Sequence, residues 1–158
     1  MSITLENFCK QFQAKNKEAQ DFLDNTAPRL AGAVAIKHAE ENFQREGLGG
    51  RRWKEVQRRK PGTAAYRSNK EHHPARLTRK ILTGDTGDLG RSLSAEYGKG
   101  TVTIASDKIY AKVHNEGLHA GRGAGFTMPK RTFLSDGKML TDLVKETIAG
   151  EFNKIFNK

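Results

Sequence analysis

The feature that most constrains the fold is a basic segment at residues 51–80, which interrupts the apolar patterning of the chain. It carries eleven Lys and Arg residues against two Glu residues. No apolar period of a helix or a strand runs through it, so we expect a long loop. Trp53 and Tyr66 are expected to anchor this loop to a core, although their rings could instead stack on nucleic-acid bases. A loop of this length inside a small domain is usually functional or disordered.

Two helices are expected before the basic segment. Residues 3–24 place apolar side chains at helical intervals, which predicts an amphipathic helix with an exposed central turn. Its apolar positions are Leu5, Phe8, Cys9, Phe12, Ala19, Phe22 and Leu23. Asn25 or Thr26 is expected to cap a second helix with Pro28 in its first turn, ending in the glycines at 47, 49 and 50.

After the basic segment the sequence predicts a short turn or helix at 86–92. A β-hairpin over residues 92–97 and 101–105 is expected to follow it. Residues 109–117 predict a short helix ended by Gly117, and residues 117–125 a mobile glycine-rich loop. A strand at 126–134 and a last helix follow. The apolar face of that helix comprises Leu140, Val144, Ile148, Phe152 and Ile155.

These segments predict an α+β fold with two N-terminal helices, a small antiparallel sheet built on the hairpin and a long C-terminal helix. A length of 158 residues suits one domain over residues 1–158, with the basic loop at 51–80. The formal net charge is +10, which suits an anionic partner. Cys9 is the only cysteine, so no disulfide can form within the chain, and we expect a reducing compartment. We expect neither a secretory signal nor a membrane span.

The segment HNEGLH at residues 114–119 raises the question of a metal site. A zinc protease needs two histidines four residues apart on one helix face, whereas His114 and His119 are five apart with Gly117 between them. Asp85 and Asp88 lie beside glycines and are expected to be turn or capping residues. We therefore expect no catalytic, metal or cofactor site, and we interpret His114 as a structural residue.

The basic segment is the remaining candidate for binding. Its arginines and lysines could contact a protein partner or the phosphates of DNA without reading the DNA sequence. The candidate contact residues are Arg51, Arg52, Arg58, Arg59, Lys60, Arg67, Arg76 and Arg79.

From Phe43 onward the chain resembles the phage virion morphogenesis family, the tail completion and neck proteins of contractile-tailed phages such as Mu and P2. Two stretches carry the resemblance, Y-A-x-x-H-x-x-G at 110–117 and P-x-R-x-F-L at 129–134. Thr132 stands where proline is common in the family, and the doubled T-G-D and the strongly basic segment also depart from its pattern. The motif residues, expected to be structural, are Trp53, Gly87, Leu89, Tyr110, His114, Gly117, Pro129, Arg131 and Phe133.

The resemblance implies a structural protein of virion assembly rather than an enzyme. It would need no cofactor and would act in tail completion or head–tail joining, with other phage head–tail or tail proteins as partners, as a homo-oligomeric ring. It would be found in the host cytoplasm during assembly and then in the neck or tail of the virion. Non-specific DNA contact is compatible with this role. The alternative is a nucleic-acid-binding protein that uses residues 51–80.

Overall fold

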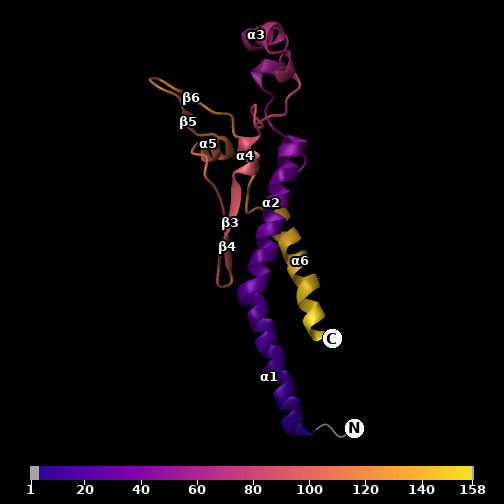
Figure 1. Cartoon of the computed structure of the whole chain (residues 1–158). Helices are drawn as coiled ribbons and strands as arrows, with labels where there is room; N and C mark the ends of the chain where they lie inside the picture. The colour runs from indigo at the N-terminus through magenta and orange to yellow at the C-terminus, as the bar shows by residue number, and fades with distance from the viewer. Residues whose placement is uncertain (1–3, 158) are drawn as a thin grey trace. The chain divides into compact units, whose positions relative to one another are not determined.

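The structure, a computed structural model, describes residues 4–157 and confirms the α+β class (Figure 1). Its longer helices are α1 (Leu5–Asp21), α2 (Ala27–Arg45), α3 (Ala64–His72), α5 (Tyr110–Glu116) and α6 (Lys138–Phe156). The short helical elements are η1 (Phe22–Thr26), η2 (Gln57–Arg59), η3 (Pro74–Leu77) and α4 (Asp88–Arg91). The strands are β1 (Gly47–Leu48), β2 (Arg51–Arg52), β3 (Leu93–Gly98), β4 (Thr101–Ser106), β5 (His119–Ala120) and β6 (Phe126–Thr127).

The two N-terminal helices are joined by η1, a π-helical turn, so the predicted cap at Asn25 or Thr26 is wrong. The N–H of Ala27 bonds the carbonyl of Phe22, five residues back. Pro28 has no N–H, and its ring would clash with the carbonyl of residue 24 in a regular α-helix. A wider π turn relieves that clash, which lets the helix continue through the proline.

The basic segment is folded, and the expectation of a loop over 51–80 is wrong in its local structure. It contains β2, the 3-10 turns η2 and η3, and the helix α3. Thr63 caps α3 by accepting a hydrogen bond from the N–H of Tyr66, a local signal that the missing apolar period concealed. The segment is held by capping and arginine contacts rather than by an apolar stripe.

The predicted hairpin is present as β3 and β4, which pair in a two-stranded sheet. The glycine-rich loop expected at 117–125 is instead largely a small antiparallel hairpin, in which His119 faces Thr127 and Ala120 faces Phe126. The strand expected at 126–134 is confined to β6, and Met128 to Asp136 run without regular structure.

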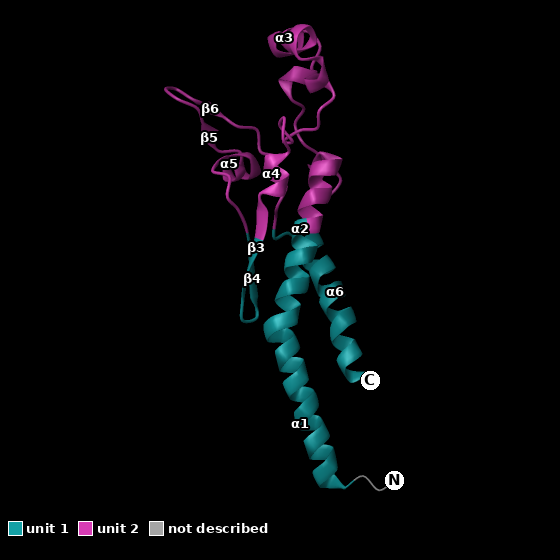
Figure 2. Cartoon of the chain, viewed as in Figure 1, with its two compact units in different colours: residues 1–36, 95–104, 136–158 teal, residues 37–94, 105–135 magenta. Residues whose placement is uncertain are grey.

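The chain divides into two compact units (Figure 2). Unit 1 comprises residues 1–36, 95–104 and 136–158, and unit 2 comprises residues 37–94 and 105–135. The single domain expected over residues 1–158 stays a prediction.

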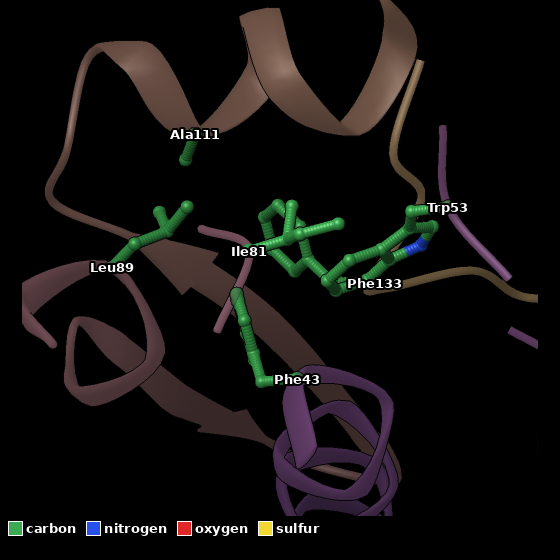
Figure 3. Packing of buried hydrophobic residues seen from close by; sticks show 6 residues of the cluster. All are labelled: Phe43, Trp53, Ile81, Leu89, Ala111 and Phe133. Atoms are coloured by element: carbon green, nitrogen blue, oxygen red, sulfur yellow. The ribbon is translucent and has the colours of Figure 1, made fainter. Parts of the chain in front are cut away.

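Unit 2 holds an aromatic core. Phe43 stacks on Phe133 with ring centroids 4.9 Å apart and meets the edge of Trp53 at 5.8 Å. Ile81, Leu89 and Ala111 complete the buried cluster, which Figure 3 shows from close by. The core thus joins α2, α4, α5 and the segments around Trp53, Ile81 and Phe133.

Unit 1 has a smaller core, in which Phe22 and Ala27 pack with Ile155 of α6. Ile148 and Phe152 lie against this cluster, as the predicted apolar face of α6 requires. Helix α1 contains no buried residue, so the prediction that only its central turn is exposed is wrong. Cys9, one of the apolar positions of the predicted amphipathic helix, is exposed.

Candidate functional site

Unit 2 contains a cavity of about 480 Å³ that brings family-motif residues together with basic residues. Leu89, Tyr110, His114 and Arg131 come from the motifs. The basic segment contributes Arg58, Arg76 and Arg79. Residues 81–86, Asp88 and Val56 complete the lining. Sequence reasoning treated the two groups as separate, and the structure places them around one space.

Helix α5 positions Tyr110 and His114 one turn apart, with ring centroids 6.1 Å from each other. Gly117 ends the helix in the left-handed region, with φ +75°, and its N–H bonds the carbonyl of Val113. A Cβ at Gly117 would lie 2.8 Å from the backbone nitrogen of Lys130. Both the positive φ and this close approach require glycine, which lets residues 130–134 run against α5.

Asn115 connects α5 to the P-x-R-x-F-L motif. Its Oδ1 accepts hydrogen bonds from the N–H groups of Phe133 at 3.0 Å and Leu134 at 3.1 Å. Its Nδ2 donates to the carbonyl of Leu134 at 3.0 Å, and its own carbonyl accepts from the Thr132 hydroxyl at 3.1 Å. Sequence reasoning missed Asn115, because it occupies a variable position of the motif and its role depends on residues 18 and 19 positions away.

Arg131 lies buried at the cavity, with 6% of its surface exposed. Its backbone N–H donates to the carbonyl of His114 at 2.8 Å. Its guanidinium donates twice to the carbonyl of Lys54, from Nε at 3.2 Å and from Nη2 at 3.0 Å. Burial lowers the pKa of Arg131, since the charged form loses hydration. The motif arginine therefore places a positive charge beside His114.

The imidazole of His114 has a buried Nδ1 for which the described part of the chain provides no hydrogen-bond partner. Burial, followed by the charge of Arg131, lowers the pKa of His114 below its ordinary value of 6.5. The ring is therefore neutral at neutral pH. The interpretation of His114 as a structural residue leaves this nitrogen unexplained.

Arg58 and Arg59 hold the basic segment together from inside. Arg58 donates to the carbonyls of Arg76 and Arg79, both at 2.8 Å, and of Lys80 at 3.1 Å. Arg59 makes a bidentate ion pair with Glu46, from Nη1 to Oε2 at 2.9 Å and from Nη2 to Oε1 at 2.7 Å. The Glu46 carboxylate also accepts the N–H of Ile81 at 2.6 Å. These two arginines therefore stabilise the fold. The sequence alone predicts them as contacts for a partner and does not show this structural role.

Arg76 and Arg79 share one carboxylate at the cavity. Asp85 pairs with Arg76 at 3.2 Å and with Arg79. Its side chain is 57% exposed, and it lies between Gly84 and Gly87, both of which have positive φ. Asp85 was expected to be a turn residue, and the ion pairs add a second role.

The remaining predicted residues lie outside the cavity. Trp53 and Phe133 belong to the aromatic core, Gly87 precedes α4 in the left-handed region, and Pro129 is half-buried. Lys60 is also half-buried, whereas the candidate contact residues Arg51, Arg52 and Arg67 are exposed.

The two candidate histidines do not form a metal site with each other. His114 lies in α5 and His119 in β5, with the turn at Gly117 between them. Within residues 4–157, no three His, Cys, Asp or Glu side chains gather closely enough to hold a metal ion. Over the same residues, no helix is long and apolar enough to cross a membrane.

Comparison with known families gives the class of this protein. The model of the phage virion morphogenesis family matches residues 5–153, and the chain belongs to that family. It is thus a protein of phage virion assembly, as the motif resemblance predicts. It is similar to the "Putative capsid assembly protein G" of Escherichia phage Mu, with 31% identity over 99 residues. The match covers 60% of this chain and 56% of that relative, so the chain spans little more than half of the relative's length. No solved structure matches the chain.

Proposed function

We propose that this protein acts in tail completion or head–tail joining, as a non-enzymatic structural component that forms a homo-oligomeric ring. Membership of the virion morphogenesis family over residues 5–153 supports the general role. Because that match includes residues of both units, we also propose that the two units work as one domain. Its partners would be other phage head–tail or tail proteins, met in the host cytoplasm before the virion is complete.

The main support for an oligomer is the apolar face of α1, which is exposed to solvent. Leu5 is 79% exposed, Phe8 56% and Phe12 57%. Phe8 and Phe12 line an apolar groove with Phe156 of α6. Fully burying one such side chain contributes roughly 1.5–3 kcal/mol, so this face gains considerably from a partner.

The charge of α1 favours a second copy of the chain as that partner. The helix carries three lysines, Lys10, Lys15 and Lys17, and three acidic residues, Glu6, Glu18 and Asp21. Its net charge is therefore zero, although the whole chain carries +10. Two copies can approach through α1 without the repulsion that the rest of the surface would impose. A ring follows when one copy's α1 face meets a different patch on the next copy.

Sedimentation or light scattering as a function of concentration tests this proposal. Replacing Phe8 and Phe12 by Ser should lower the mass to that of the monomer. A matched control replaces Gln13 and Lys17 by Ser, since both lie on the other side of the helical wheel. The control should keep the oligomer. A monomeric wild type at high concentration, or equal loss in both variants, would reject the ring.

A second candidate function is non-specific DNA binding by the basic segment. The exposed side chains of Arg51, Arg52 and Arg67 favour it. Binding to duplex DNA should weaken steeply as salt rises, by a slope of roughly 0.9 per phosphate contacted. If neutralising these three arginines abolishes DNA binding while the protein still assembles into virions, the contact is auxiliary. If it abolishes both, DNA binding is part of the assembly role.

A further inference from the structure

The cavity of unit 2 has more positive charge than its own carboxylates neutralise. Four guanidinium groups line it, from Arg58, Arg76, Arg79 and Arg131. The lining also contains Asp85, which pairs with two of them, and Asp88, which pairs with Arg91 at 3.3 Å instead. The cavity is therefore electrostatically suited to an anion.

Arg58 and Arg131 have only neutral acceptors among the described residues. Arg58 bonds three backbone carbonyls, and Arg131 bonds the carbonyl of Lys54. Within the described residues neither forms a direct ion pair, and the charge of Glu55 opposes the effect of burial on the pKa of both. A guanidinium removed from water without a counter-ion is unfavourable, and Arg131 is nearly fully buried. The lining therefore carries more guanidinium charge than Asp85 alone balances, which favours an anionic ligand over a neutral one.

His114 offers a second, independent sign of a ligand. His114 lines the same cavity, and its buried Nδ1 has no hydrogen-bond partner among the described residues. Buried polar atoms in folded proteins nearly always have a hydrogen-bond partner, so an orphan nitrogen beside a cavity indicates a group that binds there. A neutral imidazole can donate from one ring nitrogen to a ligand oxygen.

The walls of the cavity distinguish between possible anions. Val56, Ile81, Leu82, Leu89 and Tyr110 give it an apolar side. A peptide that combines a carboxylate with an apolar neighbour complements both sides of such a cavity, whereas a nucleic-acid backbone would use only the charged side.

We propose that this cavity is the binding site for an acidic peptide segment of a partner protein. The incoming carboxylate pairs with Arg76 and Arg79 and takes the place of Asp85, while an apolar residue beside it packs on Leu82 and Tyr110. Asp85 serves as an internal counter-ion until then. Because it is more than half exposed and lies between two glycines with positive φ, it can leave without disturbing the core. This site does not depend on the tail-completion role or on the ring.

Fluorescence anisotropy with two labelled hexapeptides tests the proposal. One alternates Leu and Glu, and the other alternates Leu and Gln. The Glu peptide should bind, and the Gln peptide should not. Arg76→Gln should weaken the Glu peptide about tenfold, the usual effect of one charge-assisted hydrogen bond. The control Arg67→Gln removes an exposed arginine outside the cavity and should change affinity less than about twofold.

For a second pair of variants we expect the affinity for the Glu peptide to rise instead of fall. Asp85→Asn removes the competing carboxylate and should strengthen binding of the Glu peptide several-fold. Glu71→Gln changes the net charge equally at an exposed position outside the cavity and should have no effect. Because Asp85→Asn leaves the core untouched, it keeps the proposal testable even if Arg76→Gln fails to fold.

Three outcomes would overturn the proposal. Equal losses for Arg76→Gln and Arg67→Gln, or equal gains for Asp85→Asn and Glu71→Gln, would show attraction by overall charge alone. A hexathymidylate that binds more tightly than the Glu peptide would assign the cavity to a phosphate backbone. Absence of binding by the Glu peptide to both wild type and Asp85→Asn would remove the site.

Discussion

The indole Nε1–H of Trp53 donates a hydrogen bond of 2.9 Å to the backbone carbonyl of Thr132, 79 residues further along the chain. Trp53 opens the basic segment, and Thr132 lies inside the P-x-R-x-F-L motif. The same indole packs against Phe43 in the aromatic core. One side chain thus fixes the start of the basic segment to the motif that carries Arg131.

Trp53→Phe should destabilise the protein by about 2 kcal/mol, because the partly buried carbonyl of Thr132 loses its donor and the smaller ring leaves a void. Urea unfolding followed by circular dichroism measures this difference. Arg52→Ala is the control, since the neighbouring side chain is exposed and should cost less than about 0.5 kcal/mol. Equal stability of Trp53→Phe and wild type would contradict the anchoring role.

Asn115→Ala should lower the free energy of unfolding further, by about 3 kcal/mol. It leaves the N–H groups of Phe133 and Leu134, and the carbonyl of Leu134, without their partner. Thermal unfolding provides the measurement. Lys112→Ala, at an exposed position of the same helix, should leave the melting temperature nearly unchanged. A small effect at Asn115 would mean that water satisfies these groups.

Glu46 should make stability depend on pH in the acidic range. The hydrogen bonds from Arg59 lower the pKa of the Glu46 carboxyl below its ordinary value of 4.5, against the opposing effect of burial. The unfolded chain therefore binds the proton more readily. The stabilisation is complete above pH 4.5 and is lost as pH falls through the folded-state pKa.

Glu46→Gln tests that dependence. The variant should be less stable than wild type at neutral pH, and the difference should shrink as the buffer is made acidic. Chemical unfolding at a series of pH values provides the comparison. A constant difference at every pH would show that the ion pair with Arg59 contributes nothing that titration removes.

His114 should add a second pH dependence at higher pH. Its pKa is lowered by burial and by Arg131, so the unfolded chain takes up a proton first as pH falls below 6.5. Stability associated with the neutral ring is present above that pH and decreases below it. His114→Asn removes the titration and should flatten the stability profile in this range. A wild-type profile that stays flat between pH 7.5 and the acidic limit set by Glu46, at about 4.5, would contradict the burial of a neutral imidazole.

Local patterns predicted several elements well. The hairpin of β3 and β4, the end of α5 at Gly117 and the apolar face of α6 follow from turn residues and periodicity. Pro28 misled the prediction, because a π turn can absorb a proline that would otherwise mark a helix start. The helix α3 within the basic segment escapes a search for apolar periodicity, because its signal is the Thr63 cap and not an apolar stripe.

The cavity could not be predicted, because its parts are distant in sequence. Arg58, Asp85 and Arg131 are brought together by the packing of the core and by hydrogen bonds and ion pairs between segments distant in the sequence. The exposure of α1 was also beyond local patterns. Leu5, Phe8 and Phe12 have the spacing of buried residues, and sequence periodicity does not say whether the covering surface belongs to the same chain.

The role proposed for this protein is tail completion or head–tail joining. Electron microscopy of lysates from a phage whose copy of this gene is deleted tests it most directly. We expect filled heads and tails that remain separate, or tails that are incomplete, with infectious particles restored when the wild-type chain is supplied in trans but not when Phe8 and Phe12 are both Ser. Normal infectious particles without the gene, or a block before heads form, would contradict the proposed function.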